Sequence, residues 1–412
     1  MPRGAHWVTN IDTGNTAWVI AASALVLFMT LPGLALFYGG LVRARNLLSV
    51  LMHCFLICAV ASLIWAVFGY SLVFGGGGWL IGSLDKSFLA GLGVLPREHV
   101  PEIVFALFQM TFAVITPALI IGAFPERVKF SFVIPFSALW LIFVYLPVAH
   151  WVWGGGWAAM AHVEDFAGGI VVHTTAGVSA LMAAILIGPR RGFPQHLTPP
   201  HSPGMTMAGA GMLWVGWFGF NGGSALAANA AAGYAIMATH LAAVAAALTW
   251  MAVEWWRIGK PTSIGLVTGA VAGLATVTPA SGYIGPMGAL VLGAIGGTLC
   301  FFATNLVKRR FRIDDTLDVF AVHGIGGMVG SVLVAVLALP ALGGVGYAAG
   351  MTLPRQLLVQ IATVAAAALW SLIATFILVK AIGAFTGLRV SREQEIEGLD
   401  VATHGERAYD LT

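Results

Sequence analysis

Two histidines lie deep inside apolar runs of the chain, where an ionisable side chain is costly. His173 comes eight residues after Asp165 in the stretch Asp165-Phe-Ala-Gly-Gly-Ile-Val-Val-His173, which opens an apolar run to about Ile187. Eight residues of helix rise about 12 Å, so His173 falls near the middle of a hydrocarbon layer about 30 Å thick. His323 occupies a similar stretch that begins at Asp318. Ionisable residues at such a depth predict a functional site.

The chemistry open to the two histidines depends on whether they face each other. A neutral imidazole has one donor and one acceptor nitrogen, so two facing rings can share a proton and still address a ligand. Such a pair would hydrogen-bond a small polar molecule or relay a proton. The alternative is two unrelated histidines, each bonded to a backbone carbonyl. The matching mid-run positions of His173 and His323 favour the pair.

Aromatic residues at helical spacing form a second candidate group. Phe108 and Phe112 are four residues apart, and Trp217, Phe220 and Ser224 follow one another at spacings of three and four. Each set therefore lies on one face of its helix. Packing in the core or against lipid is the ordinary role of such a stripe. The hydroxyl of Ser224 favours a face turned away from lipid.

Three side chains near the ends of apolar runs each have more than one interpretation. Trp153 lies at the outer end of its run and belongs either to the interfacial aromatic belt or to a cation–π platform. Asp165 is interpreted first as a helix N-cap, and a buried capping carboxylate also adds negative potential that attracts cations. Asp318 is interpreted as the N-cap of the run that holds His323.

The composition indicates the class of protein that must position these residues. Of 412 residues, 59% are hydrophobic and 9% are charged, and the mean hydropathy is +0.90, whereas soluble domains carry about 25% charged residues. We therefore expect a polytopic membrane protein. The formal net charge is only +3, so no nucleic-acid partner is expected. Cys54, Cys58 and Cys300 lack metal or disulfide spacing and are interpreted as small core residues.

Eleven apolar runs are expected to cross the membrane as helices. They cover residues 16–40, 49–73, 101–124, 131–152, 167–188, 205–229, 234–256, 262–279, 284–307, 318–340 and 355–380. The expected fold is therefore an all-α polytopic membrane protein. Residues 1–383 form its membrane domain, and residues 384–412 form a cytoplasmic tail.

The distribution of Lys and Arg predicts the orientation, because cytoplasmic loops carry an excess of both. With the N-terminus outside, sixteen of the 20 Lys and Arg residues fall in inside loops or in the tail, and the exceptions are Arg3, Lys86, Arg97 and Arg355. The odd number of spans agrees with this bias. Both place the N-terminus out and the C-terminus in.

A weak internal repeat relates two five-helix halves, at about residues 16–190 and 205–340. Phe37-Tyr-Gly-Gly40 echoes Phe220-Asn-Gly-Gly223, Ile115-Thr-Pro-Ala118 echoes Val277-Thr-Pro-Ala280, and each half carries one Asp…His stretch. Five is an odd number of spans, so the second half must run the opposite way through the membrane. Such inverted repeats hold the substrate path at their interface. The run at 355–380 is an extra, eleventh helix.

These motifs together resemble the ammonium transporter family, the Amt/Mep/Rh proteins, and within it the bacterial Amt branch. The stretches that carry the resemblance extend over nearly the whole chain. They are Ala35-Leu-Phe-Tyr-Gly-Gly-Leu-Val-Arg43, Phe108-Gln109 with Phe112, Ala149-His-Trp-Val-Trp-Gly-Gly-Gly156, the Asp165…His173 stretch, Gly216-Trp-Phe-Gly-Phe-Asn-Gly-Gly-Ser224, Thr278-Pro-Ala-Ser-Gly-Tyr283, Asp318-Val-Phe-Ala-Val-His-Gly324 and Glu397-Gly-Leu-Asp-Val-Ala-Thr-His-Gly405.

The resemblance implies an ammonium transporter for nitrogen uptake, not an enzyme, in which each subunit of a homotrimer encloses its own pore. The outer ammonium-binding site is expected from Trp153, Phe112, Ser224 and Asp165. The gate is expected from Phe112 and Phe220, the proton relay from the twin histidines His173 and His323, and the pore wall from Trp217 and Thr278. No cofactor and no metal ion are expected.

The expected mechanism holds ammonium at the outer site, removes a proton, and passes ammonia through an apolar pore. The expected location is the cytoplasmic membrane. The tail is expected either as a solvated, partly disordered segment or, by resemblance, as a folded segment that couples subunits and responds to a P-II signalling protein. Three rival functions stay open: an electroneutral channel for ammonia or carbon dioxide gas, an ammonium receptor with little transport, and a membrane redox enzyme with His173 and His323 as haem ligands.

Overall fold

The structure is a computed structural model that describes residues 10–195 and 198–410. Arg3, which belongs to the charge count above, lies outside the described residues. The helices are α1 (Thr13–Phe28), η1 (Met29–Leu34), α2 (Ala35–Leu41), η2 (Ala44–Asn46), α3 (Leu47–Ile64), η3 (Trp65–Gly69), α4 (Tyr70–Phe74), η4 (Ser87–Leu89), α5 (Glu102–Ile120), η5 (Ile121–Ala123), α6 (Phe130–Trp140), η6 (Leu141–Tyr145), α7 (Leu146–Val152), α8 (Trp157–Met160), η7 (Gly169–Thr174), α9 (Thr175–Ile187), α10 (Pro203–Gly223), α11 (Ala230–Ile258), α12 (Ser263–Val277), α13 (Pro286–Asn305), η8 (Leu306–Arg310), η9 (Phe320–Gly324), α14 (Ile325–Leu337), η10 (Pro340–Leu342), α15 (Leu353–Thr386), α16 (Arg392–Glu397) and α17 (Leu399–His404).

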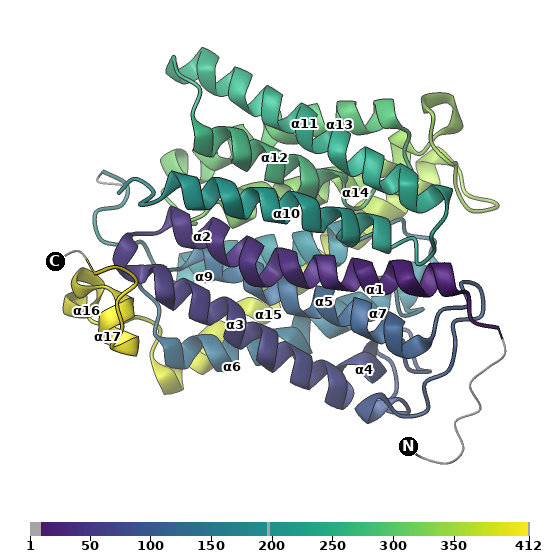
Figure 1. Ribbon diagram of the computed structural model, residues 1–412, viewed down its shortest axis with the longest axis horizontal. Coiled ribbons are helices and arrows are strands. Elements are labelled where there is room, and N and C mark those ends of the chain that lie inside the picture. The colour runs from purple at the N-terminus through teal and green to yellow at the C-terminus, as the bar shows by residue number, and fades with distance from the viewer. Residues whose placement is uncertain (1–9, 196–197, 411–412) are drawn as a thin grey trace.

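The helices form one bundle whose long members run between the same two ends (Figure 1). Within the described part of the chain, nine helical segments are long and apolar enough to cross a membrane. Two more helices coincide with the predicted runs 205–229 and 262–279, namely α10, with 21 residues, and the apolar but shorter α12, with 15 residues. The chain is thus a multi-pass membrane protein, and the number of eleven crossings stays a prediction.

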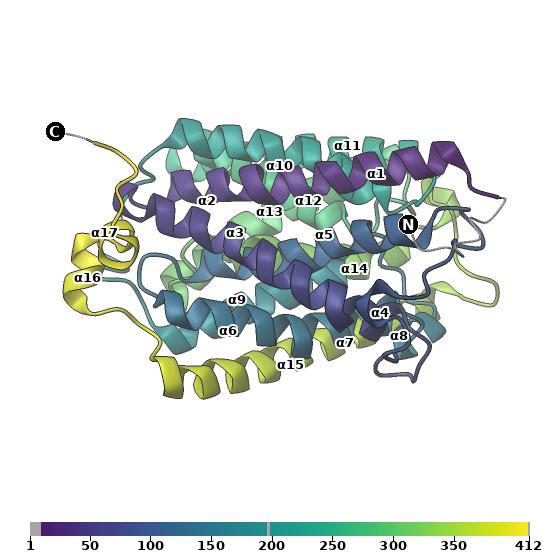
Figure 2. The ribbon, with the colours of Figure 1, turned by 60° about the horizontal axis from the view of Figure 1, so that its bottom comes forward.

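The two ends of the bundle differ in what they carry. In Figure 2, α16 and α17 lie beyond the left-hand end of the bundle, which we call the tail end, and α1 begins at the opposite, right-hand end. The first helix and the tail thus lie at opposite ends, as an odd number of crossings requires. Which end faces the cytoplasm stays a prediction.

The tail contains the short helices α16 and α17 and is bound to the bundle, so the expectation of a partly disordered tail is wrong for residues 384–410. The Asp400 carboxylate accepts hydrogen bonds from the backbone N–H groups of Leu48 (3.1 Å) and Ser49 (2.8 Å) at the start of α3. The Asn46 side chain accepts another from the N–H of Leu399 (2.8 Å). Backbone groups that α3 leaves unpaired at its N-terminus therefore hold the tail in place.

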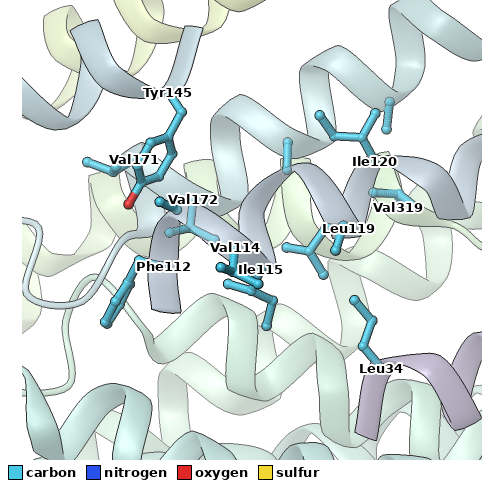
Figure 3. Packing of buried hydrophobic residues seen from close by; sticks show 14 of the residues in the cluster. Leu34, Phe112, Val114, Ile115, Leu119, Ile120, Tyr145, Val171, Val172 and Val319 are labelled. Atoms are coloured by element: carbon cyan, nitrogen blue, oxygen red, sulfur yellow. The ribbon is translucent and has the colours of Figure 1, made fainter. Parts of the chain in front are cut away.

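The core of the bundle contains an apolar lumen. Figure 3 shows Phe112, Ile115 and Leu119 of α5 beside Val172 of η7, with Leu34 of η1 nearby. All five are buried. Apart from Phe112, they line a small cavity that also reaches both predicted site histidines. The fold therefore encloses the residues that the sequence singles out.

Candidate functional site

The helix that carries His173 begins at a carboxylate. Both oxygens of Asp165 accept backbone N–H groups, from Gly168 (2.9 Å) and Gly169 (2.6 Å) on one oxygen and from Ile170 (2.8 Å) and Val171 (3.1 Å) on the other. Asp165 is itself buried. Four otherwise unpaired donors are thereby satisfied, which confirms the capping role predicted for Asp165. The first turns form the π-helical segment η7, and such turns are common at functional sites.

The helix that carries His323 is built in the same way, but its cap is Asp315 and not Asp318. Asp315 accepts the N–H groups of Val319 (3.1 Å) and Phe320 (2.8 Å). The prediction that Asp318 caps this helix is wrong, because its side chain turns to Lys308 instead (2.7 Å). The correct residue had a sequence signal: Asp315 precedes His323 by eight residues, as Asp165 precedes His173.

The two capped helices cross in opposite directions with their backbones in contact. A Cβ atom on Gly177 would lie 2.2 Å from the backbone nitrogen of Gly324, and one on Gly327 would lie 2.6 Å from the Cβ of His173. Each glycine stands four residues after a site histidine and meets the other helix near its histidine. The reciprocal pairing supports the inverted relation of these two helices, while the full five-helix repeat stays a prediction.

This crossing brings the histidines together. The Nδ1 atoms of His173 and His323 are 3.2 Å apart, and the ring centroids are 5.1 Å apart at an interplanar angle of 20°. Both residues are buried. One Nδ1 must donate and the other accept, so the rings share one proton. The alternative of two unrelated histidines, each bonded to a carbonyl, is wrong for this arrangement.

The wall beside the pair is fixed by a hydrogen bond between two predicted site residues. Trp217 Nε1 donates to the Thr278 hydroxyl (2.8 Å), which in turn donates to the carbonyl of Leu274 (2.7 Å). The indole ring stacks against His173 at 5.5 Å and 25°. Thr278 follows the last residue of α12, so the end of that helix orients the indole that holds the histidine ring.

Aromatic rings close the lumen toward the end opposite the tail. The rings of Phe112 and Phe220 are 4.3 Å apart and tilted by 38°, and Phe220 also stacks 6.1 Å from His173. Outside them, the Trp153 ring meets the edge of Phe112 at 5.7 Å and 83°. Trp153 Nε1 donates to the backbone carbonyl of Asp165 (2.9 Å). The structure thus brings five predicted site residues into one column, from Trp153 to His323.

The remaining predicted aromatic and hydroxyl residues lie beside this column. Phe108 packs edge-on against Phe112 at 5.0 Å. Ser224 lies one turn beyond Phe220, and its hydroxyl donates to the Phe220 carbonyl (2.9 Å). The hydroxyl oxygen of Ser224 keeps its lone pairs for a donor from outside.

The lumen is narrow and apolar at the histidines. Its cavity holds about 10 Å³ and is lined by His173, His323, Trp217, Phe37, Phe220 and apolar side chains of η1, α5, η7, α10 and α12. That volume is about the room of a single water-sized molecule. The Nε2 atom of His173 is buried without a hydrogen-bond partner in the described structure. A small molecule with both a donor and an acceptor would satisfy it.

A wider cavity, which we call the tail-end vestibule, opens on the other side of His323. It holds about 190 Å³ and is lined by His323, Asp318, Lys308, Arg190 and Thr316, among others. The loop that carries Arg190 contacts the tail, because the N–H of Arg191 donates to Glu395 (2.8 Å). The vestibule therefore connects the histidine pair with the tail end of the bundle.

Ion pairs hold the rim of this vestibule. Arg190 donates to Asp314 (2.9 Å) and to Glu126 (3.3 Å), and Arg43 lies 3.1 Å from Glu126. Burial alone would raise the pKa of Glu126, but Arg190 and Arg43 hold it below its ordinary value. The pKa of Asp314 is likewise low because Arg190 outweighs its burial. These carboxylates are charged partners and are not free to exchange protons near neutral pH.

One buried carboxyl escaped the sequence analysis. Glu164, directly before Asp165, is buried, and one of its oxygens has no hydrogen-bond partner in the described structure. Burial raises its pKa to about 7. Its backbone is held by Gln360, which accepts from the Glu164 N–H and donates to its carbonyl (2.8 Å each). A polar residue beside an N-cap in a loop carries no signal of burial in the sequence.

The histidine pair is not arranged as the two axial ligands of a haem. Such ligands lie on opposite sides of the iron, with the macrocycle between them, whereas the two Nδ1 atoms contact each other directly at 3.2 Å. Across residues 10–195 and 198–410, no group of three or more His, Cys, Asp or Glu side chains is placed to bind a metal. The geometry gives no support to haem ligation by His173 and His323.

Comparison with known families gives a match over almost the entire chain. A family model described as Ammonium Transporter Family matches residues 17–409. The chain is 47% identical to an ammonium transporter of Aquifex aeolicus, over 97% of this chain and 94% of that protein. It is 44% identical to the ammonium transporter Amt1 of Archaeoglobus fulgidus, over 97% of this chain and the full length of that protein.

Solved structures give the same result for the fold. The fold is similar to that of a sensor Amt protein, with a TM-score of 0.89 and 30% identity over 95% of this chain and 98% of that chain. It is also similar to Saccharomyces cerevisiae Mep2, with a TM-score of 0.85 and 36% identity over 94% of this chain and 91% of that chain.

Proposed function

The chain belongs to the ammonium transporter family, and from that premise we propose that it conducts ammonium-derived ammonia through the column from Trp153 to His323. Its relatives are transporters and not enzymes. The observation that carries the proposal is the histidine pair, joined at 3.2 Å beside a lumen with room for one small molecule.

Ammonium is recruited at the end opposite the tail. Trp153 and Phe112 present two ring surfaces there, the Ser224 hydroxyl can accept a hydrogen bond, and Asp165 adds negative potential from behind Trp153. A cation over a good aromatic ring gains about 0.5–2 kcal/mol. This is enough to gather ammonium from solution but far less than its full hydration.

The lumen beyond the gate favours a neutral molecule. Moving an unpaired ion into surroundings like these costs tens of kcal/mol by a Born estimate, and the Phe112–Phe220 gate returns little of that. Ammonium can meet this constraint by releasing a proton, whereas potassium cannot. Ammonium therefore becomes ammonia plus a proton at the gate, and ammonia enters the lumen alone.

The histidine pair then guides ammonia by hydrogen bonding. With one proton shared between the two Nδ1 atoms, one Nε2 is an acceptor and the other a donor. Ammonia can donate to the first and accept from the second. Return of the released proton to the outer solution would move no charge; we propose instead that it crosses by way of the pair, which carries a current.

Two other transport-related functions remain as alternatives to this cycle. An electroneutral channel for ammonia or carbon dioxide would use the same apolar lumen and the same narrow volume. A receptor with little transport is favoured by one specific observation, the likeness to a solved structure titled a sensor Amt protein. Both alternatives predict no sustained current.

The setting of the molecule completes the proposal. The tail end, which carries most of the basic residues, faces the cytoplasm, and the membrane is the cytoplasmic membrane. The chain assembles as a homotrimer with one pore in each subunit. The bound tail, anchored through Asp400 and Asn46, is the surface on which a P-II signalling protein would act.

The experiment is a current measurement on solid-supported membranes after an ammonium pulse, with a potassium pulse as control. We expect a sustained ammonium current in the wild-type protein and none in a double variant with His173→Ala and His323→Ala. An unchanged current in the double variant would refute the role of the pair. No current with uptake still visible by an internal pH dye would favour the gas channel, and binding without either signal would favour the receptor.

A further inference from the structure

The tail-end vestibule already contains an alkylammonium group in an oxygen-lined site. Lys308 Nζ donates to Asp318 Oδ2 (2.7 Å) and to the backbone carbonyl of Thr316 (3.2 Å). Each of the two charged side chains is 20% exposed. All three residues line the vestibule together with His323, the inner member of the pair. The site thus lies where a molecule leaving the lumen arrives.

Asp318 has binding capacity that Lys308 does not use. Its second carboxylate oxygen, Oδ1, is buried and has no hydrogen-bond partner in the described structure. Its backbone has a φ of +61°, a left-handed conformation that is uncommon outside glycine. Capping of the helix needs neither feature, because Asp315 performs it. Strain of this kind is often kept where a side chain serves a site.

The chemistry of the site suits free ammonium. A protonated lysine head and an ammonium ion are both compact tetrahedral nitrogen cations that donate hydrogen bonds, three from lysine and four from ammonium. Charge-assisted N–H···O bonds to a carboxylate are about 2.7–2.9 Å long, as seen for Lys308. Ammonium in place of the lysine head would have a fourth donor for the unpartnered Oδ1.

Of the basic residues that line the vestibule, Lys308 is the one free to move away from its carboxylate partner. Arg190 lines the same vestibule, but its guanidinium is engaged by Asp314 and Glu126. Lysine is a point charge on a flexible four-carbon stem and makes no rigid two-pronged contact. Lys308 can therefore swing away without dismantling the ion pairs of the rim.

We propose that Asp318 and the Thr316 carbonyl form a second ammonium site at the inner mouth, and that Lys308 occupies it as a tethered competitor. The proposal rests on the transport function proposed above. Ammonium entering from the cytoplasmic side must displace Lys308, so the lysine lowers the affinity of this site and disfavours backflow. Removing the lysine head exposes the site to free cations.

The direct test uses thallous ion, a heavy monovalent cation close to ammonium in size, in crystals of three proteins. We expect an anomalous peak within about 3 Å of the Asp318 carboxylate in Lys308→Met, which keeps the apolar stem. We expect no such peak in the wild-type protein or in Lys308→Met with Asp318→Asn. No peak in Lys308→Met, or the same peak in the double variant, would overturn the site. A peak in the wild-type protein with Lys308 still bonded to Asp318 would refute the claim that lysine and free cation compete for the site.

The functional test compares ammonium currents driven from each side of oriented membranes. Lys308→Met should lower the KM for ammonium on the tail side about tenfold and change the KM on the opposite side less than twofold. Arg309→Met is the matched control, because this exposed neighbour carries the same charge and does not line the vestibule. An equal effect of both variants would show a general charge effect and overturn the proposal. Absence of both current and uptake visible by an internal pH dye in the wild-type protein would instead mean that the transport function itself is wrong.

Discussion

Substituting Gly177 with alanine tests whether the helix crossing sets the geometry of the histidine pair. The new Cβ would lie 2.2 Å from the backbone nitrogen of Gly324 and 2.3 Å from its Cα, where an ordinary contact begins at 3.4 Å. Both contacts are backbone atoms that cannot rotate away. The two helices must therefore separate by about 1 Å at a point next to His323.

A separation of this size is enough to break the pair. The Nδ1 atoms are 3.2 Å apart, so an added 1 Å takes them to about 4.2 Å, beyond hydrogen-bond distance. Overpacking costs about 1–3 kcal/mol, and the better helix propensity of alanine returns up to about 1 kcal/mol. The net loss is well below the free energy of unfolding of an ordinary domain, about 5–15 kcal/mol. We therefore expect a folded protein with a misaligned site.

The matched control is Gly288→Ala. Gly288 is also a buried glycine of a long apolar helix, but its new Cβ would lie 3.5 Å or more from its neighbours. Both variants should unfold within a few degrees of the wild-type protein. Gly177→Ala should lose ammonium current at least tenfold, while Gly288→Ala should keep it. Wild-type current in Gly177→Ala, or an equal loss in both variants, would refute the claim that this crossing aligns the histidines.

Three further predictions concern other parts of the molecule. Glu164 has a pKa of about 7 when folded and near 4.5 when unfolded, so the unfolded state binds fewer protons and stability falls as pH rises through that window. Glu164→Gln should therefore match the wild-type melting temperature at pH 4 and exceed it at pH 8. Parallel curves of melting temperature against pH for the two proteins would contradict this. Asp400→Ala removes the carboxylate that anchors the tail on α3, which should weaken tail binding by about 0.5–2 kcal/mol and speed proteolysis of the tail. The control Glu393→Ala, at an exposed position of the tail, should leave the proteolysis rate unchanged. Equal proteolysis rates in the two variants would contradict the anchoring role. Thr278→Val leaves the Trp217 N–H unpaired, which costs about 1–3 kcal/mol, and should lower both melting temperature and current; an unchanged melting temperature would mean that the indole finds another acceptor.

Much of the architecture was predictable because the hydrophobic pattern of a membrane helix is strong. All eleven predicted runs coincide with helices of the structure. The pairing of His173 with His323 was predictable because both stand in similar Asp…His stretches, one in each predicted half of the chain. A polar residue in hydrocarbon is rare enough that its position alone carries information.

The details that depend on contacts between distant segments could not be read from the pattern. Asp315 has the same spacing to His323 as Asp165 has to His173, but the left-handed backbone that turns the nearer Asp318 to Lys308 has no such signal in the sequence. Glu164 is buried although it is polar, and its backbone is held by Gln360 of α15, which also donates to the Ser331 carbonyl of α14. The contact of Gly177 with Gly324 joins residues far apart in the chain, and its closeness depends on the angle at which the two helices meet.

Because the histidines are joined Nδ1 to Nδ1, the tautomers of the two rings depend on the side from which the pair last received a proton. When His173 holds the shared hydrogen, its Nε2 is bare and His323 Nε2 carries a hydrogen. A proton that enters at His173 pushes the shared hydrogen across and releases another from His323, which leaves the opposite tautomers behind. The pair can then accept a proton only from the other side, until a ring turns over or a proton passes back. Repeated one-way proton movement therefore needs a reset step after every passage, and no current carried by this route can exceed the rate of that step.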